Sequence, residues 1–343
     1  MPEVFRGREL VLTLPGELIK AGIAGIGVYV PERVLTNAQL EEMVDTSHEW
    51  ISTRCGIHQR HIAAPEQATS DLAVLAAERA LKNAGLAPEE LDLVIVATNT
   101  QDMIFPSTAC LVQDRIGAAK AGAFDLAAGC AGFIYALAVG SQFISTGSSR
   151  YVLVVGAENL SKFVNWEDRK TCVLFGDAAG AVVLGPAREG SGFTSFKLRA
   201  DGSGSQLLRL PAGGSRLPAS LETVENKLHY IHMKGREVFK FAVRVLVEIT
   251  EEVLSAGGLG KRDLDFFIPH QANTRIIDAA AKRLELPPEK ILVNVDRYGN
   301  TSTASIPLAL EEALRGGRIR EGDNIVLAGF GAGLTWAAAL LKW

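Results

Sequence analysis

The sequence nearly repeats itself at a constant offset of 173 residues, and this feature constrains the fold more than any other. At this spacing the pair Gly85-Leu86 matches Gly258-Leu259. The apolar run Tyr151-Val-Leu-Val-Val-Gly156 falls on Asn324-Ile-Val-Leu-Ala-Gly329 at the same offset. Because repeats in sequence reflect repeated structural units, two matches so far apart indicate a duplication. The sequence therefore predicts two equivalent halves.

Each half alternates helix and strand patterns. Ser70 can cap a helix that ends near Gly85, and an apolar strand at residues 91–97 follows it. Residues 237–256 and then 265–268 repeat this order in the second half. Such alternation is typical of largely parallel sheets that are covered by helices. We expect an α/β fold whose two halves form a layered body with pseudo-twofold symmetry.

Cys130 lies where a short apolar strand turns through small residues into an apolar helix, in Phe124-Asp-Leu-Ala-Ala-Gly-Cys-Ala-Gly-Phe-Ile-Tyr-Ala-Leu137. Unpaired N–H groups and the positive end of the dipole at a helix N-terminus favour thiolate over thiol. A thiolate is a strong nucleophile for acyl groups. A lone cysteine is often only a small buried apolar residue, but the glycines at this helix start favour a nucleophile. Cys110 and Cys172 lack this setting and are expected to be structural.

Two further polar residues follow strands or turns of the second half. His270 stands in Ile268-Pro-His-Gln-Ala-Asn273, at the end of a strand, and Asn300 stands in Arg297-Tyr-Gly-Asn-Thr-Ser302. Taken alone, they could be a core histidine and a turn residue. Shifting Cys130 by 173 residues gives position 303, so the Cys130 and Asn300 loops are expected to be equivalent turns that face each other. Because α/β proteins place chemistry at the carboxyl ends of strands, we expect the three groups to converge.

The glycine-rich segment Gly329-Phe-Gly-Ala-Gly333 does not have the spacing of a dinucleotide-binding loop. It is followed by an apolar run at residues 334–341 that is typical of a strand. Glycines let the backbone come close to a neighbour, so backbone N–H groups near a reacting carbonyl explain this loop better.

Composition excludes several other classes. A hydrophobic content of 48% with 22% charged residues describes a soluble globular protein, and the net charge of −4 disfavours general nucleic-acid binding. The four cysteines show no paired short spacing, which fits reduced thiols in a cytoplasmic protein. The segment Cys55-x-x-His58-x-x-His61 has clustered potential ligands but no apparent fourth, so no metal is expected.

No part of the chain is expected to enter a membrane. The apolar run at residues 10–14 is too short for a signal peptide and has acidic residues close to both ends. Residues 126–149 carry no charge and are long enough to span a bilayer. However, this segment contains Gly129, Gly132 and Gly140 with several hydroxyl residues and begins in the Cys130 motif, which favours a buried core helix.

Together these segments resemble the β-ketoacyl-acyl-carrier-protein synthase III family, which are thiolase-fold condensing enzymes that start bacterial type II fatty-acid synthesis. The resemblance covers about residues 22–343. Besides the Cys130 motif, it is carried by Asp45-Thr-Ser-His-Glu-Trp-Ile-Ser-Thr-Arg54, Phe175-Gly-Asp-Ala-Ala-Gly180, Pro269-His-Gln-Ala-Asn273, Gly299-Asn-Thr-Ser302 and Gly331-Ala-Gly-Leu-Thr-Trp336. The Cys-His-Asn set is typical of this branch, since elongating synthases use two histidines.

The resemblance implies a five-layered αβαβα body made of two duplicated halves. Residues 21–190 would form the half with the nucleophile, and residues 191–343 the half with the histidine and asparagine. Residues 1–20 would be an N-terminal extension without a family counterpart.

The resemblance also implies the chemistry. Cys130 would take an acyl group from acyl-CoA, and His270 and Asn300 would then assist decarboxylation of malonyl-acyl carrier protein. The backbone amides of Cys130 and Ala332 would form the oxyanion hole for the acyl carbonyl. Acyl-CoA is a substrate in this scheme, and no cofactor is implied.

Other positions match family sites for binding. Contacts to CoA would be made by Trp50, Arg54, Arg169, Arg236 and Asn273. Phe105 would cross a homodimer interface and close an acyl pocket that suits a short primer such as acetyl. A basic rim that receives the acidic carrier protein would consist of Lys240, Arg275, Lys282 and Arg283, although without the resemblance these residues would be read as a solvated helix face.

Three rival functions are compatible with parts of the sequence. A related thiolase-fold synthase or acyltransferase that primes polyketide or other secondary-metabolite synthesis would use the same three residues. A thiol hydrolase could also use a cysteine, a histidine and an asparagine, but the duplication and the glycine loop disfavour it. A scaffold without catalysis would leave the three groups idle. The preferred acyl chain is not predicted.

Overall fold

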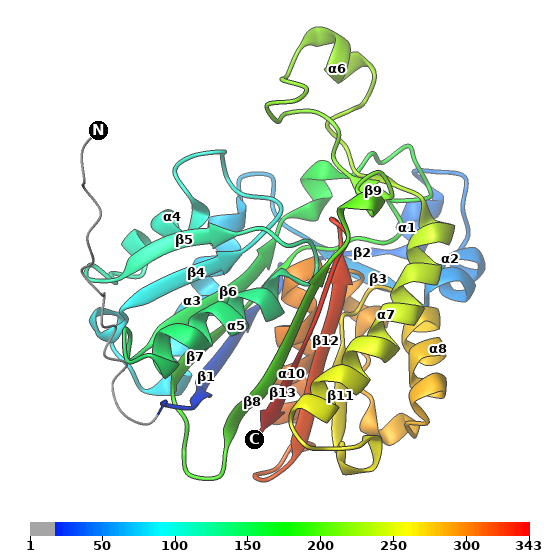
Figure 1. Ribbon diagram of the computed structural model, residues 1–343. Helices are drawn as coiled ribbons and strands as arrows, with labels where there is room; N and C mark the ends of the chain where they lie inside the picture. The colour runs from blue at the N-terminus through cyan, green and yellow to red at the C-terminus, as the bar shows by residue number, and fades with distance from the viewer. Residues whose placement is uncertain (1–17) are drawn as a thin grey trace, which may run out of the picture.

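The computed structural model describes residues 18–343, which form two main β-sheets with helices around them (Figure 1). The first sheet has the strand order β1-β7-β6-β4-β5 and contains β1 (Ala21–Tyr29), β4 (Leu93–Ala97), β5 (Gly122–Leu126), β6 (Val152–Glu158) and β7 (Ala178–Pro186). The second has the order β11-β12-β13-β8 and contains β8 (Gly192–Ala200), β11 (Phe266–Pro269), β12 (Asn324–Gly331) and β13 (Thr335–Lys342).

The two sheets have equivalent topologies. Strands β1, β7, β6 and β4 correspond in order to β8, β13, β12 and β11. In each half one equivalent pair is parallel, β4 with β6 and β11 with β12, and the next strand, β7 or β13, is antiparallel to it. The equivalence ends at the fifth strand: β5 pairs with β4 over its whole length, whereas the second half has only an isolated parallel bridge from Phe267 to Ile291. The predicted duplication is confirmed.

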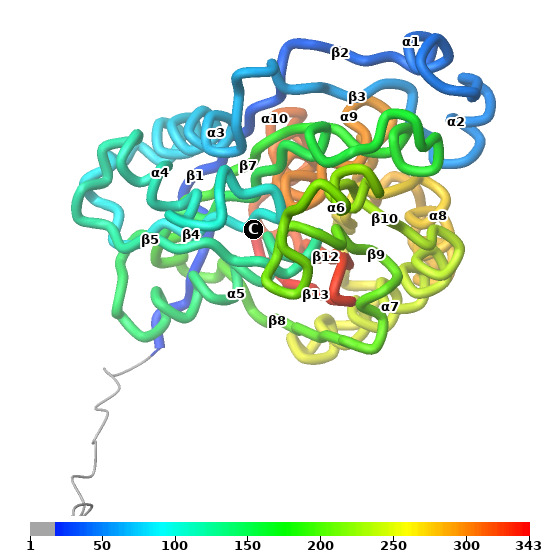
Figure 2. The backbone as a smooth tube through the Cα atoms, turned by 90° about the horizontal axis from the view of Figure 1, so that it is seen from above, coloured from blue at the N-terminus to red at the C-terminus, as the bar shows by residue number. Residues whose placement is uncertain are grey.

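The helices complete five layers. The central layer consists of α5 (Gly132–Ser145) and α10 (Ser305–Arg315), and one buried apolar cluster joins both helices to both sheets. The outer face of the first sheet is covered by α3 (Thr69–Ala84) and α4 (Thr108–Arg115), and that of the second by α7 (Gly235–Ala256) and α8 (Thr274–Leu284). Figure 2 shows α5 and α10 between the two groups of outer helices. The expected αβαβα thiolase-like fold is confirmed.

The central position of α5 explains its composition. A helix that packs on a sheet at either side has no solvent face, so charged residues would be buried without partners. Nine of its fourteen residues are buried. Within residues 18–343, no helix has the length and the apolar character needed to cross a membrane.

The start of α3 differs from the sequence prediction. The helix begins at Thr69 after Ala68, and the Asp71 carboxylate accepts the Ala68 N–H at 2.6 Å. Ser70 lies inside the first turn, where its hydroxyl donates to Asp102 at 2.7 Å, so the prediction that Ser70 caps the helix was wrong. A downstream loop offered the Ser70 hydroxyl a tertiary partner, which local sequence cannot reveal. The helix ends at Gly85 in a left-handed conformation, as expected.

Smaller elements surround the upper ends of the sheets in Figure 1. They are β2 (Arg33–Thr36), α1 (Asn37–Glu41), α2 (His48–Cys55), β3 (Gln59–Ile62), β9 (Leu208–Arg209), α6 (Leu221–Glu225), β10 (His232–Met233) and α9 (Val295–Tyr298). The short helix α6 projects away from the body in this view. Most of the N-terminal extension expected at residues 1–20 lies outside the described residues.

Candidate active site

Cys130 lies immediately before α5, on a loop that contacts the end of β12. A Cβ atom built on Gly331 would lie 2.1 Å from the Cys130 backbone nitrogen, and one built on Gly129 would lie 2.5 Å from the Ala332 nitrogen. Real Cβ contacts are never this short, so both positions require glycine. The backbone of the glycine-rich segment thus lies against the nucleophile loop. The sequence predicted this close approach in place of a dinucleotide-binding loop.

The environment of Cys130 opposes ionisation. Burial raises the pKa of the thiol to about 12, and the charge of the nearby Glu158 adds to this effect. The interaction with the Ser302 side chain acts in the opposite direction but is smaller. The expectation of a resting thiolate was therefore wrong, because the loss of solvation outweighs the helix N-terminus. In the resting protein the sulfur carries its proton.

His270 follows β11 and is a neutral imidazole. Burial lowers its pKa to about 3. Its Nδ1 atom lies 2.7 Å from the Ser305 hydroxyl oxygen, which also accepts the Gln271 N–H at 3.3 Å. The Ser305 hydroxyl can donate its proton to Nδ1 while its oxygen accepts the Gln271 N–H, and we assign the His270 tautomer on this basis. The ring proton is then on Nε2, which can donate to a ligand.

The side chain of Asn300 is oriented by its own loop. Its backbone N–H donates to the Leu174 carbonyl at 2.8 Å, and its Oδ1 accepts the Ser302 N–H at 2.9 Å. The preceding Gly299 has a φ of 67°, in the left-handed region that favours glycine. Because Oδ1 is occupied by a backbone donor, the amide NH₂ group is the part of Asn300 that is offered to a ligand.

The structure brings Cys130, His270 and Asn300 to one hollow of about 130 Å³. The remainder of its lining is largely apolar and comes from β9, β10, β12, the outer helices α7 and α8, and loop residues 174–175 and 272–273. The ring of Phe330 packs edge-on against His270, with ring centroids 5.3 Å apart. Such a pocket excludes water, and hydrogen bonds to a developing charge are strong in a dry site.

Cys130 also lines a second hollow, of about 190 Å³. Gly129, Ala332 and Ser302 line it together with mostly apolar residues. Cys130 thus lines two cavities, and the Ala332 backbone expected to form part of the oxyanion hole lies close to the nucleophile loop. A two-sided site suits a reaction in which an acyl group stays in one cavity while a second substrate enters the other.

The residues expected to contact CoA fall into two places. The guanidinium carbons of Arg54 and Arg169 lie 5.4 and 5.2 Å from the ring centroid of Trp50, so these three form one surface cluster. Asn273 begins α8, where its Oδ1 accepts the Arg275 N–H at 2.9 Å and its Nδ2 donates to the Arg54 carbonyl at 3.1 Å. Asn273 therefore connects the cluster to the hollow that it lines. Arg236 is exposed in the first turn of α7.

Phe105 and the basic rim lie on the surface. Phe105 is 83% exposed in the loop before α4 and does not line either hollow of its own chain. The Arg275 guanidinium packs over the ring of Phe239, which lines the hollow, at 5.6 Å. The other members of the rim, Lys240, Lys282 and Arg283, are exposed on α7 and α8.

Three polar residues that support the site were not found from the sequence. Ser302 and Ser305 hold Asn300 and His270 in orientation, and Glu158 is a fully buried carboxyl group behind Cys130. A sequence signal existed for Glu158, because it is an acidic residue directly after the buried run at residues 152–157, at the carboxyl end of a strand.

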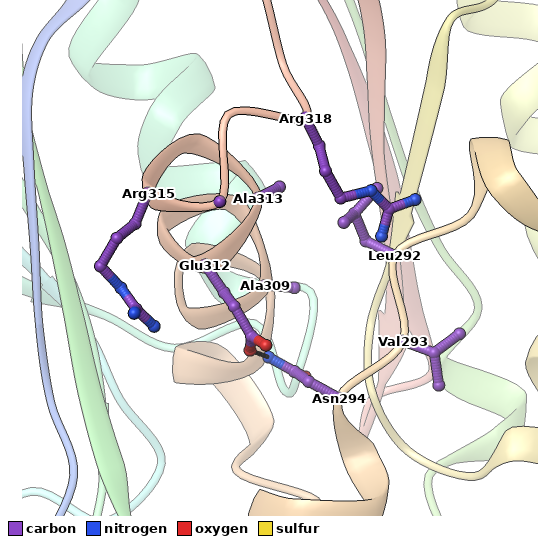
Figure 3. A pocket seen from close by; sticks show the side chains of 9 residues that line it. Leu292, Val293, Asn294, Ala309, Glu312, Ala313, Arg315 and Arg318 are labelled. Atoms are coloured by element: carbon purple, nitrogen blue, oxygen red, sulfur yellow. Dashed lines mark hydrogen bonds between the residues drawn. The ribbon is translucent and has the colours of Figure 1, made fainter.

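Another hollow, of about 280 Å³, lies between α10 and residues 292–294 and is shown in Figure 3. Its carboxylate, Glu312, accepts hydrogen bonds from Asn294 at 3.1 Å and from Arg297 at 2.5 Å. Each oxygen of the acidic group thus has a protein partner, and none of the three reactive residues lies here. We regard this hollow as structural.

The segment considered for a metal has other partners. The Cys55 thiol donates to the Ile51 carbonyl at 3.1 Å, and His61 Nδ1 lies 2.6 Å from the Pro31 carbonyl oxygen. In the described part of the chain, no group of three or more histidine, cysteine or acidic residues is arranged to hold a metal ion.

Comparison with known proteins identifies the family. Residues 124–202 match the model for 3-oxoacyl-acyl-carrier-protein (ACP) synthase III, and residues 254–343 match the model for its C-terminal part. The chain is 60% identical over 327 residues to β-ketoacyl-acyl-carrier-protein synthase III of Caldanaerobacter subterraneus, covering 95% of this chain and 99% of that protein. A crystal structure of the synthase III from Thermus thermophilus is similar with a TM-score of 0.88 and 56% identity, covering 94% of this chain and 99% of that one.

A polyketide enzyme is also similar, but less so. The priming β-ketosynthase of the R1128 polyketide pathway is 38% identical, with a TM-score of 0.87, and 95% of this chain and 98% of that one are covered. The higher identity to the synthases disfavours the alternative of polyketide priming. The chain belongs to the β-ketoacyl-acyl-carrier-protein synthase III family.

Proposed function

We propose that the protein condenses a short acyl-CoA with malonyl-acyl carrier protein to give a 3-oxoacyl-acyl carrier protein and so initiates fatty-acid synthesis. The observation that carries this proposal is the convergence of Cys130, His270 and Asn300 on one dry hollow in a member of this family. The two hydrogen-bond donors line the same hollow as the nucleophile, which suits a carbon–carbon bond formed in that hollow.

In the first half-reaction the Cys130 sulfur attacks the thioester carbonyl of acyl-CoA. The carbon–sulfur bond to Cys130 forms, the bond to CoA breaks, and the acyl group remains on the protein. The negative charge on the carbonyl oxygen would be stabilised by the backbone N–H groups of Cys130 and Ala332, which a glycine-lined contact holds close together.

In the second half-reaction malonyl-acyl carrier protein loses carbon dioxide and leaves an enolate. The Nε2–H of His270 and the NH₂ group of Asn300 would donate to the enolate oxygen. His270 suits this role because burial keeps it neutral, and Asn300 does not titrate. The enolate carbon then attacks the acyl group on Cys130 and releases its sulfur.

Binding partners follow from the surface around the hollow. The cluster of Trp50, Arg54 and Arg169 would hold the adenine and phosphates of CoA by stacking and charge. Arg236 and Asn273 would contact the same substrate nearer the hollow. Docking of the acidic carrier protein would involve the rim formed by Lys240, Arg275, Lys282 and Arg283, mainly by speeding encounter.

We further propose that the protein is a homodimer in which Phe105 of one copy closes the acyl hollow of the other. A large aromatic side chain that is 83% exposed is typical of an interface. Its bulk would limit the acyl group to a short chain such as acetyl.

Mass spectrometry of the intact protein after incubation with acyl-CoA tests the function. We expect a mass increase of one acyl group, mapped by peptide analysis to Cys130, and subsequent formation of 3-oxoacyl product from malonyl-acyl carrier protein. Cys130→Ser should form no product, because a hydroxyl group is far less nucleophilic. Cys110→Ser, which replaces an exposed thiol outside the hollows, is the matched control. Acylation of Cys110 alone would contradict the proposal.

A further inference from the structure

Glu158, the last residue of β6, is a carboxyl group that is 0% exposed. Its Oε1 atom accepts hydrogen bonds from Asn99 Nδ2 at 2.7 Å, from the Ser302 hydroxyl at 2.9 Å and from the Thr303 hydroxyl at 3.2 Å. Its Oε2 atom accepts from the Thr100 hydroxyl at 2.7 Å and from the Asn99 N–H at 3.1 Å. The proposed half-reactions assign no role to this network.

Ser302 connects this carboxyl group to the nucleophile. Its hydroxyl donates to Glu158 Oε1 at 2.9 Å, and Ser302 lines the same hollow as Cys130, where its side chain acts to lower the pKa of the thiol. The residue has a φ of 48°, an uncommon conformation for a residue other than glycine, and its N–H is held by Asn300 Oδ1 at 2.9 Å. A hydroxyl group has one proton and two lone pairs, so it can pass a proton from one neighbour to the other.

Attack on a thioester requires the Cys130 thiol to lose its proton, and burial makes this unfavourable. His270 is a poor acceptor, because burial lowers its pKa to about 3. Glu158 is a better one: burial raises the pKa of its carboxyl group, while the hydrogen bonds from Thr100, Asn99 and Ser302 favour the carboxylate form that can accept a proton. The elements around Glu158 present the hydroxyl or amide groups of Thr98, Asn99, Thr100, Ser302 and Thr303, and the titratable group that faces it is the Cys130 thiol.

We propose that Glu158 accepts the thiol proton of Cys130 through the Ser302 hydroxyl. The S–H bond of Cys130 breaks as its proton joins Ser302 Oγ, while the proton of Ser302 passes to Glu158 Oε1. The buried site keeps a single negative charge throughout, which moves from the carboxylate to the sulfur. Glu158 does not contact the substrate itself. It receives the proton through Ser302 and is therefore a positioning residue.

The proton has a way back after acyl transfer. Ser302 lines the second hollow next to the sulfur. When CoA leaves as a thiolate, the proton can return from Glu158 through Ser302 to the leaving sulfur, which restores the carboxylate. Only the identity of this leaving group rests on the proposed function; the transfer between Cys130 and Glu158 does not.

Alkylation of Cys130 by iodoacetamide measures the transfer without any acyl substrate. The wild type, in a Cys110→Ser background, should react at a nearly constant rate between roughly pH 6 and pH 9, because the thiolate forms by internal transfer. Glu158→Gln should react at least tenfold more slowly at neutral pH. Its rate should rise about tenfold per pH unit, as for a thiol that ionises to solvent.

A purely electrostatic role for Glu158 predicts the opposite sign. A buried carboxylate beside the sulfur raises the pKa of the thiol, so its removal would speed alkylation. An alkylation rate in Glu158→Gln equal to or above that of the wild type would therefore overturn the proposal. Asp177→Asn is the matched control: Asp177 is 0% exposed and hydrogen-bonded to Ser161 and Ala63, but it does not line either hollow. This control should keep the flat pH profile.

Two further variants keep the test decisive if Glu158→Gln does not fold. Ser302→Ala leaves the carboxyl group in place but removes the connecting hydroxyl, and it should show the same slow, pH-dependent alkylation. Glu158→Asp retains an acceptor and should recover part of the flat profile. A flat profile in Ser302→Ala would overturn the relay. If the proposed function were wrong, acyl-CoA would not label Cys130 but these alkylation results would stand.

Discussion

Replacement of Asn300 by Asp changes one NH₂ group to an oxygen and leaves the shape of the side chain intact. The two hydrogen bonds that hold the loop do not use this NH₂ group: Oδ1 accepts the Ser302 N–H at 2.9 Å, and the Asn300 backbone donates to Leu174 at 2.8 Å. We therefore expect Asn300→Asp to fold. Asn300→Ala, by contrast, leaves the Ser302 N–H without its acceptor, at a cost of about 1–3 kcal/mol in stability.

The loss of the donor should act on one half-reaction. Removal of one hydrogen bond to a developing oxyanion costs about 3 kcal/mol, which corresponds to a decrease of roughly 150-fold in the decarboxylation of malonyl-acyl carrier protein. The acylation of Cys130 should change much less, because no enolate exists in that step.

The introduced carboxyl group also adds a pH dependence. At only 8% exposure its pKa should lie above that of an ordinary Asp, since burial disfavours the charged form. The protonated acid can still donate to the enolate, whereas the carboxylate repels it. Decarboxylation by Asn300→Asp should therefore fall as the pH rises.

The assay follows release of carbon dioxide and acylation of Cys130 separately, from about pH 5 to pH 8. The His270→Ala variant serves as a comparison, because it removes the other donor and adds no titrating group. Equal losses in both half-reactions for Asn300→Asp, or a decarboxylation rate that does not vary with pH, would refute the assigned role of the amide.

Three other predictions follow from burial and close contacts. The pKa of His270 is about 3 in the folded protein, below its unfolded value, so its neutral form contributes stability above about pH 6.5 that is lost as the pH falls. Replacement by Gln removes this term. In urea unfolding, the free energy of unfolding of His270→Gln should therefore fall less steeply with acid than that of the wild type, by roughly 1.4 kcal/mol per pH unit between about pH 6.5 and pH 4. Gly331→Ala should reduce acylation of Cys130 by at least about tenfold, because the added Cβ atom would collide with the Cys130 backbone nitrogen. Gly202→Ala is the control: its added Cβ atom has no neighbour within 4 Å, so the free energy of unfolding should change by less than about 1 kcal/mol. Phe105→Thr should shift the acyl-CoA preference from acetyl toward longer chains, and a wild type that loads twelve-carbon chains as well as acetyl would contradict this.

Much of the fold could be predicted because its signals are local and occur twice. The repeat at 173 residues gave two equivalent sheets, and the uncharged segment around α5 became the central layer. Helix starts were less predictable. Ser70 is a good capping residue by type, but its hydroxyl bonds to Asp102 in a distant loop, so a tertiary contact overrode the local preference.

The candidate site was predictable in its members but not in its electrostatics. The motifs around Cys130, His270 and Asn300 each carry glycines or strand ends that sequence reveals. The ionisation of Cys130 depends on burial by residues from both halves, which no local pattern contains. In the same way, Glu158 and Ser302 are 144 residues apart in the sequence, so the hydrogen bond between them could be found only from the folded structure.

The incomplete fifth strand of the second half limits how copies of the chain can associate. In the first half β5 is a full edge strand with one side already paired to β4, so its other side can accept a strand from a second copy. The corresponding edge of the second half offers only the bridge at Ile291. If both edges were complete, molecules could join head to tail without end and grow into filaments. A pair formed through β5 would use the same edge of both molecules, so that contact would close after two copies.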